Sequence, residues 1–441
     1  MMLIKNATLV EFEPPRIREG EDVLIEGDSI KSVGKNLSAD GAERVIDASG
    51  KLLFPGIVCS HNHYYSGLAR GIMADIPPTP DFVSILKNLW WRLDRAVDKE
   101  NLLSAGLICC LDAIKNGTTS VIDHHASPNF IEGSLSVLQE AFETAGLRGA
   151  SCYEVTDRHG EADMEAGVAE NLAFAEKIDT EKKAGSWKGL MEAHIGGHAP
   201  CTIPDAGLKQ IAETCEKTGR GFHVHLAEDR WDVSHSHITY GKDLIARLDE
   251  FGLVNEKSIL VHGVFLNDDE VNLINEKEAF LVHNGRSNMN NGIGYNQRLP
   301  LYKNLALGTD GIGTDMFVEM NGAYFKHKDE GGPLWPGDYL KALAAGNRIL
   351  ERSFGRKFGR LEEGYAADLV IADYNSPTPL KAENFAGHMV FGMNASIVET
   401  VMINGRLVLE NREFPFDVKP IYARAREEAA KLWDAMNNIE P

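Results

Sequence analysis

The sequence predicts an α/β fold, a distorted (β/α)8 TIM barrel with a small β-sandwich module built from both chain ends. Three observations favour this fold. Eight short apolar runs alternate with amphipathic stretches through the middle of the 441-residue chain. Alternating strands separated by glycine-containing turns occupy both ends. Histidine or aspartate ends most of the eight runs, as catalytic residues do at the carboxyl ends of barrel strands.

The two chain ends share short runs in which apolar residues alternate with polar ones. These runs are 3–10 and 22–25 near the N-terminus, and 367–371 and 401–408 near the other end. We therefore expect residues 1–52 and 360–415 to form one composite β-sandwich module. In the last segment, 416–441, a helix over 420–437 is predicted because one face would carry Ile421, Ala425, Ala429, Leu432, Trp433 and Met436.

The middle of the chain, residues 53–359, is predicted to form the barrel. The eight apolar runs are 53–60, 118–123, 148–155, 189–194, 221–225, 258–262, 279–283 and 305–309. Helical patterns lie between them, over 100–116, 162–178, 205–218, 241–251 and 338–350. An open doubly wound sheet is the alternative, but Gly311-Ile312-Gly313 is not followed by the third glycine of a dinucleotide-binding fingerprint.

Composition excludes several classes of partner. The net charge of −20 argues against nucleic acid or an anionic membrane, which both attract basic surfaces. No apolar stretch reaches the roughly 18 residues of a membrane span, and the N-terminus lacks the apolar core of a signal peptide. The six cysteines are scattered without a CxxC pair, which is typical of a reducing compartment. We expect a cytoplasmic protein.

Most of the predicted barrel strands end in residues that can bind a metal ion. His61 and His63 are two residues apart after the first run, so their imidazoles would point to the same side. Six of the other seven runs end in Asp123-His124-His125, His194, His223-Val224-His225, His262, His283 and Asp310. One such residue alone is readily explained by packing, whereas their repetition at strand ends predicts a shared site.

Histidine and carboxylate ligands without a thiolate suit zinc, iron(II) or manganese. His61, His63 and His225 would supply three nitrogens and Asp310 an oxygen. This set leaves a position for water, as catalytic metal sites do. A divalent metal ion lowers the pKa of bound water from about 15.7 towards about 7, so hydroxide becomes available at neutral pH.

Three residues are candidates for proton transfer at the same site. Glu228, three residues after His225, would carry a proton to the leaving group. His262 would orient the hydroxide or polarise the attacked carbon. Asp310 would take the first proton from the water if it faces both the water and the metal.

Several of these segments resemble motifs of the amidohydrolase superfamily, in its chlorohydrolase and S-adenosylhomocysteine-deaminase branch. They are 53–63, 223–228, 259–263, 283–288 and 307–311, and 364–370 resembles a strand of that family's β module. The resemblance spans almost the whole chain and is greatest to a group of aminohydrolases in that branch. It implies a mononuclear site with ligands His61, His63, His225 and Asp310, proton-handling residues Glu228 and His262, and a substrate contact at His198.

At two places the sequence differs from members of the superfamily that it resembles. Binuclear members of the superfamily use a lysine on strand four, and 189–194 contains none, so one divalent metal ion is expected, zinc first with iron(II) as the alternative. Many relatives have proline after the His-Asn of strand seven. Here Gly285-Arg286 follow Asn284, so a differently shaped loop is expected.

The substrate pocket is predicted from fewer residues. Trp90 lies in the long segment after the first strand and could stack on a planar heterocycle or pack against the barrel. Arg158 follows the third strand and could bind a polar or anionic substituent, or remain a surface charge. No role is assigned to the remaining strand-end histidines, which are expected to pack or to support the ligands: His124, His125, His194 and His283.

The predicted reaction is hydrolytic deamination of an amino-substituted nitrogen heterocycle, a small-molecule substrate, at a non-peptide C–N bond. Hydrolytic opening of a cyclic amide or imidine, and dechlorination, are the alternatives. Glu228 argues against dechlorination, because ammonia needs a proton to leave and chloride does not. A non-catalytic barrel scaffold is disfavoured because the ligands and both proton-handling residues are retained. A homo-oligomer is left open.

Overall fold

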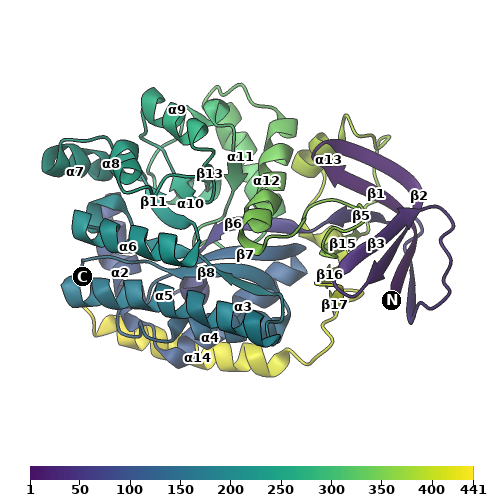
Figure 1. Cartoon of the computed structure of the whole chain (residues 1–441), viewed down its shortest axis with the longest axis horizontal. Helices are drawn as coiled ribbons and strands as arrows, with labels where there is room; N and C mark the ends of the chain where they lie inside the picture. The colour runs from purple at the N-terminus through teal and green to yellow at the C-terminus, as the bar shows by residue number, and fades with distance from the viewer. Residues whose placement is uncertain (441) are drawn as a thin grey trace.

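The structure, a computed structural model, describes residues 1–440 and places a barrel beside a β module (Figure 1). The barrel strands are β6 (Ile57–Asn62), β7 (Thr118–His125), β8 (Arg148–Tyr153), β9 (Met191–Ala193), β10 (Ile195–Gly197), β11 (Phe222–Leu226), β12 (Ile259–His262), β13 (Phe280–His283) and β14 (Leu305–Leu307). They pair in parallel as β6–β9 and β10–β14, and parallel bridges Asn62–Asp310 and Val155–Gly197 join the two groups. With β9 and β10 as two halves of the fourth strand, the predicted barrel is confirmed.

Helices surround the barrel strands, as the alternating sequence pattern predicts (Figure 1). They are α3 (Lys99–Lys115), α4 (Ser134–Ala145), α5 (Glu161–Ala184), α6 (Asp205–Thr218), α7 (Arg230–Tyr240), α8 (Leu244–Glu250), α9 (Asp268–Glu276), α10 (Gly285–Asn290), α11 (Met316–Asp329) and α12 (Pro336–Phe354). Asp98 caps the start of α3 in a reciprocal pair with Asn101, and α5 ends at Gly185 in the left-handed conformation. Among residues 1–440, no helix combines the length and apolarity that crossing a membrane requires.

Two predicted strands differ from the structure. The run 53–60 divides at Gly56, because β5 (Leu52–Pro55) pairs with the β module and only β6 enters the barrel. The fourth strand does not end at His194. That residue lies in the break between β9 and β10, and the strand continues to Gly197, so His198 is the residue at its end. Local apolarity marked the strand but could not show where its pairing changes from β8 to β11.

The β module combines strands from both chain ends. Its sheet has the order β17-β16-β15-β5-β1-β2-β3, with β4 paired to β1. The strands are β1 (Met2–Phe12), β2 (Pro15–Glu26), β3 (Ser29–Gly34), β4 (Arg44–Asp47), β5, β15 (Leu369–Ala372), β16 (Val398–Ile403) and β17 (Arg406–Leu409). Antiparallel pairing of β5 with β15 joins the two chain ends at the start of the barrel.

The C-terminal helix α14 (Lys419–Asn437) lies along α3 and close to the short helix α2 (Trp91–Ala96) (Figure 1). Ala425, Ala429, Leu432 and Met436 of its predicted apolar face are buried. Arg92 donates to the carbonyl oxygens of Met436 and Ile439 at 2.7 and 2.8 Å, which satisfies groups at the helix end. Two further α-helices are α1 (Phe82–Ile85), which with α2 belongs to the segment after β6, and α13 (Phe385–Phe391), near the β module.

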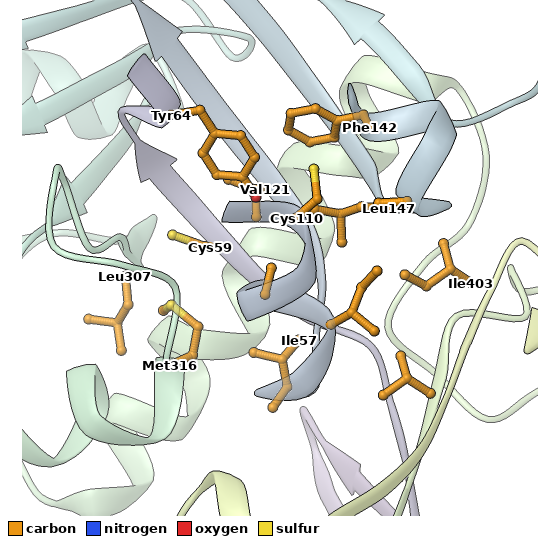
Figure 2. Close-up of a cluster of buried hydrophobic side chains, with 14 of the residues drawn as sticks. Ile57, Cys59, Tyr64, Cys110, Val121, Phe142, Leu147, Leu307, Met316 and Ile403 are labelled. Atoms are coloured by element: carbon orange, nitrogen blue, oxygen red, sulfur yellow. The ribbon is translucent and has the colours of Figure 1, made fainter. Parts of the chain in front are cut away.

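A large apolar cluster fixes the first barrel strand. Figure 2 shows side chains of β6, β7, α3 and α4 in this cluster, among them Ile57, Cys59, Val121, Cys110 and Phe142. The rings of Tyr64 and Phe142 stack with centroids 4.9 Å apart. Because Tyr64 directly follows His63 and is fully buried, this packing limits the movement of the adjacent metal-competent histidines.

A buried ion pair connects the barrel to the β module, and we expect it to be important for stability. Arg148 at the start of β8 donates to Asp368 through Nε at 2.6 Å and Nη2 at 3.0 Å. Replacing Arg148 with methionine leaves the Asp368 carboxylate buried without its partner, and is expected to lower the free energy of unfolding by about 3–5 kcal/mol. Urea denaturation followed by circular dichroism measures this change.

The exposed pair Lys326–Glu330 provides a matched control. Lys326→Met removes an (i, i+4) ion pair on the surface and should change the unfolding free energy by less than about 1 kcal/mol. Equal effects of the two methionine variants would contradict the role assigned to the Arg148–Asp368 pair.

Candidate active site

The carboxyl ends of the barrel strands bring four predicted metal ligands together. His61 and His63 leave the end of β6, His225 comes from β11, and Asp310 follows β14. His63 Nε2 lies 3.1 Å from His225 Nε2 and 2.9 Å from Asp310 Oδ1, while His61 Nε2 lies 3.6 Å from Asp310 Oδ1. Residues separated by up to about 250 positions in the sequence therefore present nitrogen and oxygen atoms to one point.

The arrangement fits a divalent metal ion on two observations. Candidate ligand atoms of His61, His63, His124 and His225 lie within 4.8 Å of one another, as do those of His61, His262 and Asp310. The Nε2 atoms of His61 and His262 are buried and have no hydrogen-bond partner within residues 1–440. Buried nitrogens without partners are costly, and a metal ion or the water beside it would satisfy them.

Hydrogen bonds orient the ligands from behind. His61 Nδ1 and His223 Nε2 are 2.9 Å apart, which leaves His61 Nε2 for a ligand bond. His63 Nδ1 is 2.6 Å from the carbonyl oxygen of His124, and His225 Nδ1 is 2.9 Å from that of His198. This second contact for each ring fixes the imidazole orientation, as is usual in metal sites.

Burial sets the protonation of several groups. It lowers the pKa of His61 to about 3, so the ring is neutral and has a lone pair for a metal. Burial opposes ionisation of Asp310, but the imidazoles of His61 and His63 outweigh it and hold the pKa of that carboxyl well below its usual value. Burial and the neighbouring Asp310 raise the pKa of Glu228 well above its usual value. Glu228 is therefore suited to hold a proton that Asp310 cannot retain.

The two predicted proton-handling residues lie beside the ligands. His262 Nε2 is 3.7 Å from both Glu228 Oε2 and Asp310 Oδ2. His262 Nδ1 contacts Asn288 Oδ1 at 2.9 Å, and Ser287 donates to Asp310 Oδ2 at 2.7 Å. These polar contacts hold the three groups around one small space.

The backbone is strained where three of the strands end. Ala227, His262 and Asp310 have φ angles of 46°, 73° and 55°, which lie in the left-handed region that residues other than glycine rarely adopt. Such conformations persist only when surrounding structure enforces them, and they cluster at active sites. Here they turn the chain at the ends of β11, β12 and β14, which are the fifth, sixth and eighth strands of the barrel.

A cavity opens beside this cluster and is continuous with solvent at its mouth. The three predicted substrate contacts, His198, Trp90 and Arg158, all line this cavity. Glu228 and Asp310 line it as well. The His198 ring lies 5.6 Å from that of His225. Arg158 is not a free surface charge, because it pairs with Asp94 inside the cavity wall.

Two polar residues at the site were missed by the sequence reasoning. Glu154 follows β8, and its Oε1 lies 3.1 Å from His63 Nδ1 and 3.4 Å from His124 Nδ1. The rule that selected other strand ends would have found it. No sequence pattern predicts a role for Asp94 in α2. It lines the cavity because of the path that the long segment after β6 takes in the folded chain.

The unassigned histidines occupy different environments. His124 stacks on His223 with ring centroids 4.4 Å apart, and neither of its ring nitrogens makes a hydrogen bond within residues 1–440, although Glu154 lies near Nδ1. His125 contacts Ser127 Oγ at 2.8 Å, and His194 contacts Ser353 Oγ at 3.0 Å. His283 ends β13 and is buried, and neither of its ring nitrogens makes a hydrogen bond within residues 1–440. Among these four, His124 lies nearest to the ligand atoms.

A short helix, α10, begins directly after β13, in the loop for which the sequence predicts a different shape. Gly285 begins α10, and a Cβ there would lie 2.8 Å from the Cβ of Ala323. Arg286 donates to Glu319 Oε2 at 2.6 Å and to the carbonyl oxygen of Ile312 at 3.0 Å. These contacts anchor the helix that carries Ser287 and Asn288 towards the site.

The geometry and the sequence agree on one class of protein. The sequence profile of the Amidohydrolase family matches residues 52–408. The chain belongs to this family of metal-dependent hydrolases. The predictions of the superfamily and its branch, the barrel fold and an enzyme that hydrolyses C–N bonds are confirmed.

Particular relatives refine this assignment. The chain is 30% identical to a 5-methylthioadenosine/S-adenosylhomocysteine deaminase of Caldanaerobacter subterraneus, over 98% of each sequence. It is 27% identical to a 5'-deoxyadenosine deaminase of Methanosarcina acetivorans, again over 98% of each. Among solved structures, an adenosine deaminase of Xanthomonas campestris with bound zinc superposes with a TM-score of 0.83 at 25% identity, over 98% of each chain.

Proposed function

We propose that this protein hydrolytically deaminates an amino-substituted nitrogen heterocycle. The observation that carries the proposal is the position of Glu228, a carboxyl that is 16% exposed and has a raised pKa, 3.7 Å from His262 and beside the predicted metal ligands. A protonated carboxyl can deliver the proton that ammonia needs in order to leave. Deaminase names among the relatives support the same reaction.

We infer that His61, His63, His225 and Asp310 hold one divalent metal ion. When bound, the ion supplies Lewis-acid activation of a water molecule. Zinc is the proposed metal, since imidazole nitrogens and one carboxylate suit it and the Xanthomonas campestris deaminase carries it. Iron(II) remains the alternative because it accepts the same ligands.

The protein's own groups divide the proton transfers. Asp310, with its low pKa, accepts the proton released from water. His262 donates through Nδ1 to Asn288 Oδ1 and burial lowers its pKa, so Nε2 of the neutral ring accepts a hydrogen bond and orients the attacking water. Glu228 protonates the leaving amine. His198 and Trp90, which line the cavity, hold the heterocycle over these groups.

We also propose a cytoplasmic location. The six cysteines lie within the described residues as free thiols, which suits a reducing compartment. The acidic composition agrees with a small-molecule substrate and not with nucleic acid as partner.

A substrate screen tests the function. Metal-loaded protein is incubated with aminopurines and their 5'-substituted nucleosides, aminopyrimidines and aminotriazines, and also with the corresponding cyclic amides and chloro-substituted rings. Ammonia, ring opening and chloride are each measured. Ammonia release from at least one amino compound is expected, with no ring opening of the corresponding cyclic amides. Ring opening or chloride release without ammonia would replace deamination by the matching alternative.

A further inference from the structure

A buried ion pair in the cavity wall takes no part in the proposed proton transfers. Arg158 Nη2 lies 3.1 Å from Asp94 Oδ2, and the two side chains are only 9% and 2% exposed. The guanidinium carbon lies 4.7 Å from the centre of the Trp91 ring, which covers one face of the charge. Arg158, Asp94 and Trp91 all line the cavity.

Each member of this group retains a polar atom that bonds nothing. Arg158 Nη1, Asp94 Oδ1 and Trp91 Nε1 are buried and have no hydrogen-bond partner among residues 1–440. Buried polar atoms in folded proteins are nearly always paired, so three in one place mark an incomplete set of bonds. The set lacks a ligand that accepts from Arg158 or Trp91 and donates to Asp94.

Charge restricts the kind of ligand. The pair Arg158–Asp94 is already neutral as a unit, and the carboxyl of Glu154 lines the same cavity. An anionic substituent would therefore meet carboxyl groups without gaining a free cation. A neutral group that offers an acceptor beside a donor satisfies both partners of the pair.

We propose that Arg158 and Asp94 form a subsite for a neutral amide-type edge of the substrate, a ring carbonyl adjacent to a ring N–H. Arg158 Nη1 donates to the carbonyl oxygen, and the ring N–H donates to Asp94 Oδ1. The inference rests on the proposed function, since it describes the substrate of the same cavity. It identifies the substrate class as an oxo-substituted amino heterocycle.

The position of the subsite indicates which end of the heterocycle it contacts. The His198 ring lies 5.6 Å from the His225 ring on one side and 6.5 Å from the Trp91 ring on the other. One side chain thus separates the subsite from the predicted metal ligands. The amide-type edge therefore belongs to the end of the ring system remote from the carbon that loses its amine.

Binding of unreactive probes tests the proposal without requiring turnover. Benzimidazol-2-one carries a carbonyl between two N–H groups, benzimidazole lacks the carbonyl, and benzimidazole-2-carboxylate adds an anion. Titration calorimetry with metal-loaded protein should show benzimidazol-2-one binding at least about tenfold tighter than each of the other two. Equal binding, or tighter binding of the carboxylate, would overturn the subsite.

Variants test whether the pair Arg158–Asp94 causes the difference in affinity between benzimidazol-2-one and benzimidazole. Arg158→Gln and Asp94→Asn should each reduce the ratio of affinities for benzimidazol-2-one and benzimidazole to near one, whereas a purely structural defect would weaken both probes equally. Arg298→Gln, at the exposed pair Arg298–Asp268, is the matched control and should keep the wild-type ratio. Retention of that ratio in both cavity variants would contradict the proposal.

The probe experiment separates this inference from the proposed function. Selective binding of benzimidazol-2-one without ammonia release from any amino compound would leave the subsite standing and remove deamination. Ammonia release without selective binding of benzimidazol-2-one would support deamination and overturn the subsite.

Discussion

Replacing His225 with alanine is expected to remove the metal ion and to lower turnover by at least about 10³-fold, since a metal ion contributes several kcal/mol to hydrolysis. His225 Nε2 lies 3.1 Å from His63 Nε2, and its Nδ1 is held 2.9 Å from the carbonyl oxygen of His198. Loss of this oriented nitrogen removes one of the four proposed protein ligands and leaves a gap among ligands that are held in fixed orientations, so the affinity for the metal should fall sharply. Elemental analysis of protein purified without chelators measures the bound metal.

An exposed histidine provides the control for this experiment. His237 lies on α7, is half exposed and pairs with Asp243 at the surface. His237→Ala should retain one metal ion per chain and full activity. Near-zero metal in the unmodified protein, or full metal content in the His225 variant, would contradict the ligand assignment.

Replacing Glu228 with glutamine is expected to separate chemistry from metal binding. Glutamine matches glutamate in size but cannot exchange a proton, so turnover should fall by about 10²- to 10⁴-fold, the usual contribution of general acid–base catalysis. The metal content should stay at the wild-type level, because Glu228 is not among the proposed ligands. Steady-state rates of ammonia release together with elemental analysis measure both quantities.

Glu250→Gln is the matched control, because Glu250 pairs with Lys242 on the surface of α8. It should leave turnover and metal content unchanged. An active Glu228→Gln enzyme would remove Glu228 from the proton path. Loss of metal in that variant would instead make Glu228 a ligand.

The sequence predicted the barrel because its two signals repeat along the chain. Apolar runs recur at the spacing of β/α units, and metal-competent residues recur at their ends, as in His61, His225 and Asp310. Each signal is local, so each can be read without knowing the fold. The family resemblance covered the same positions.

The sequence predicted less accurately those features that depend on pairing between distant segments. The break at His194 arises because β9 pairs with β8 while β10 pairs with β11, and no local pattern marks that change. The separation of β5 from β6 has the same cause, since β5 pairs with β15 more than 300 positions later.

By itself, the sequence determined the fold class, the family and the candidate residues for metal binding and proton transfer. The tertiary structure alone decided which side chains share the cavity: Glu154 beside His63, and Asp94 paired with Arg158 beneath Trp91. The physical reason is that residue type and spacing fix local conformation and candidate chemistry. Partnership between buried polar atoms depends on the path of the whole chain in space.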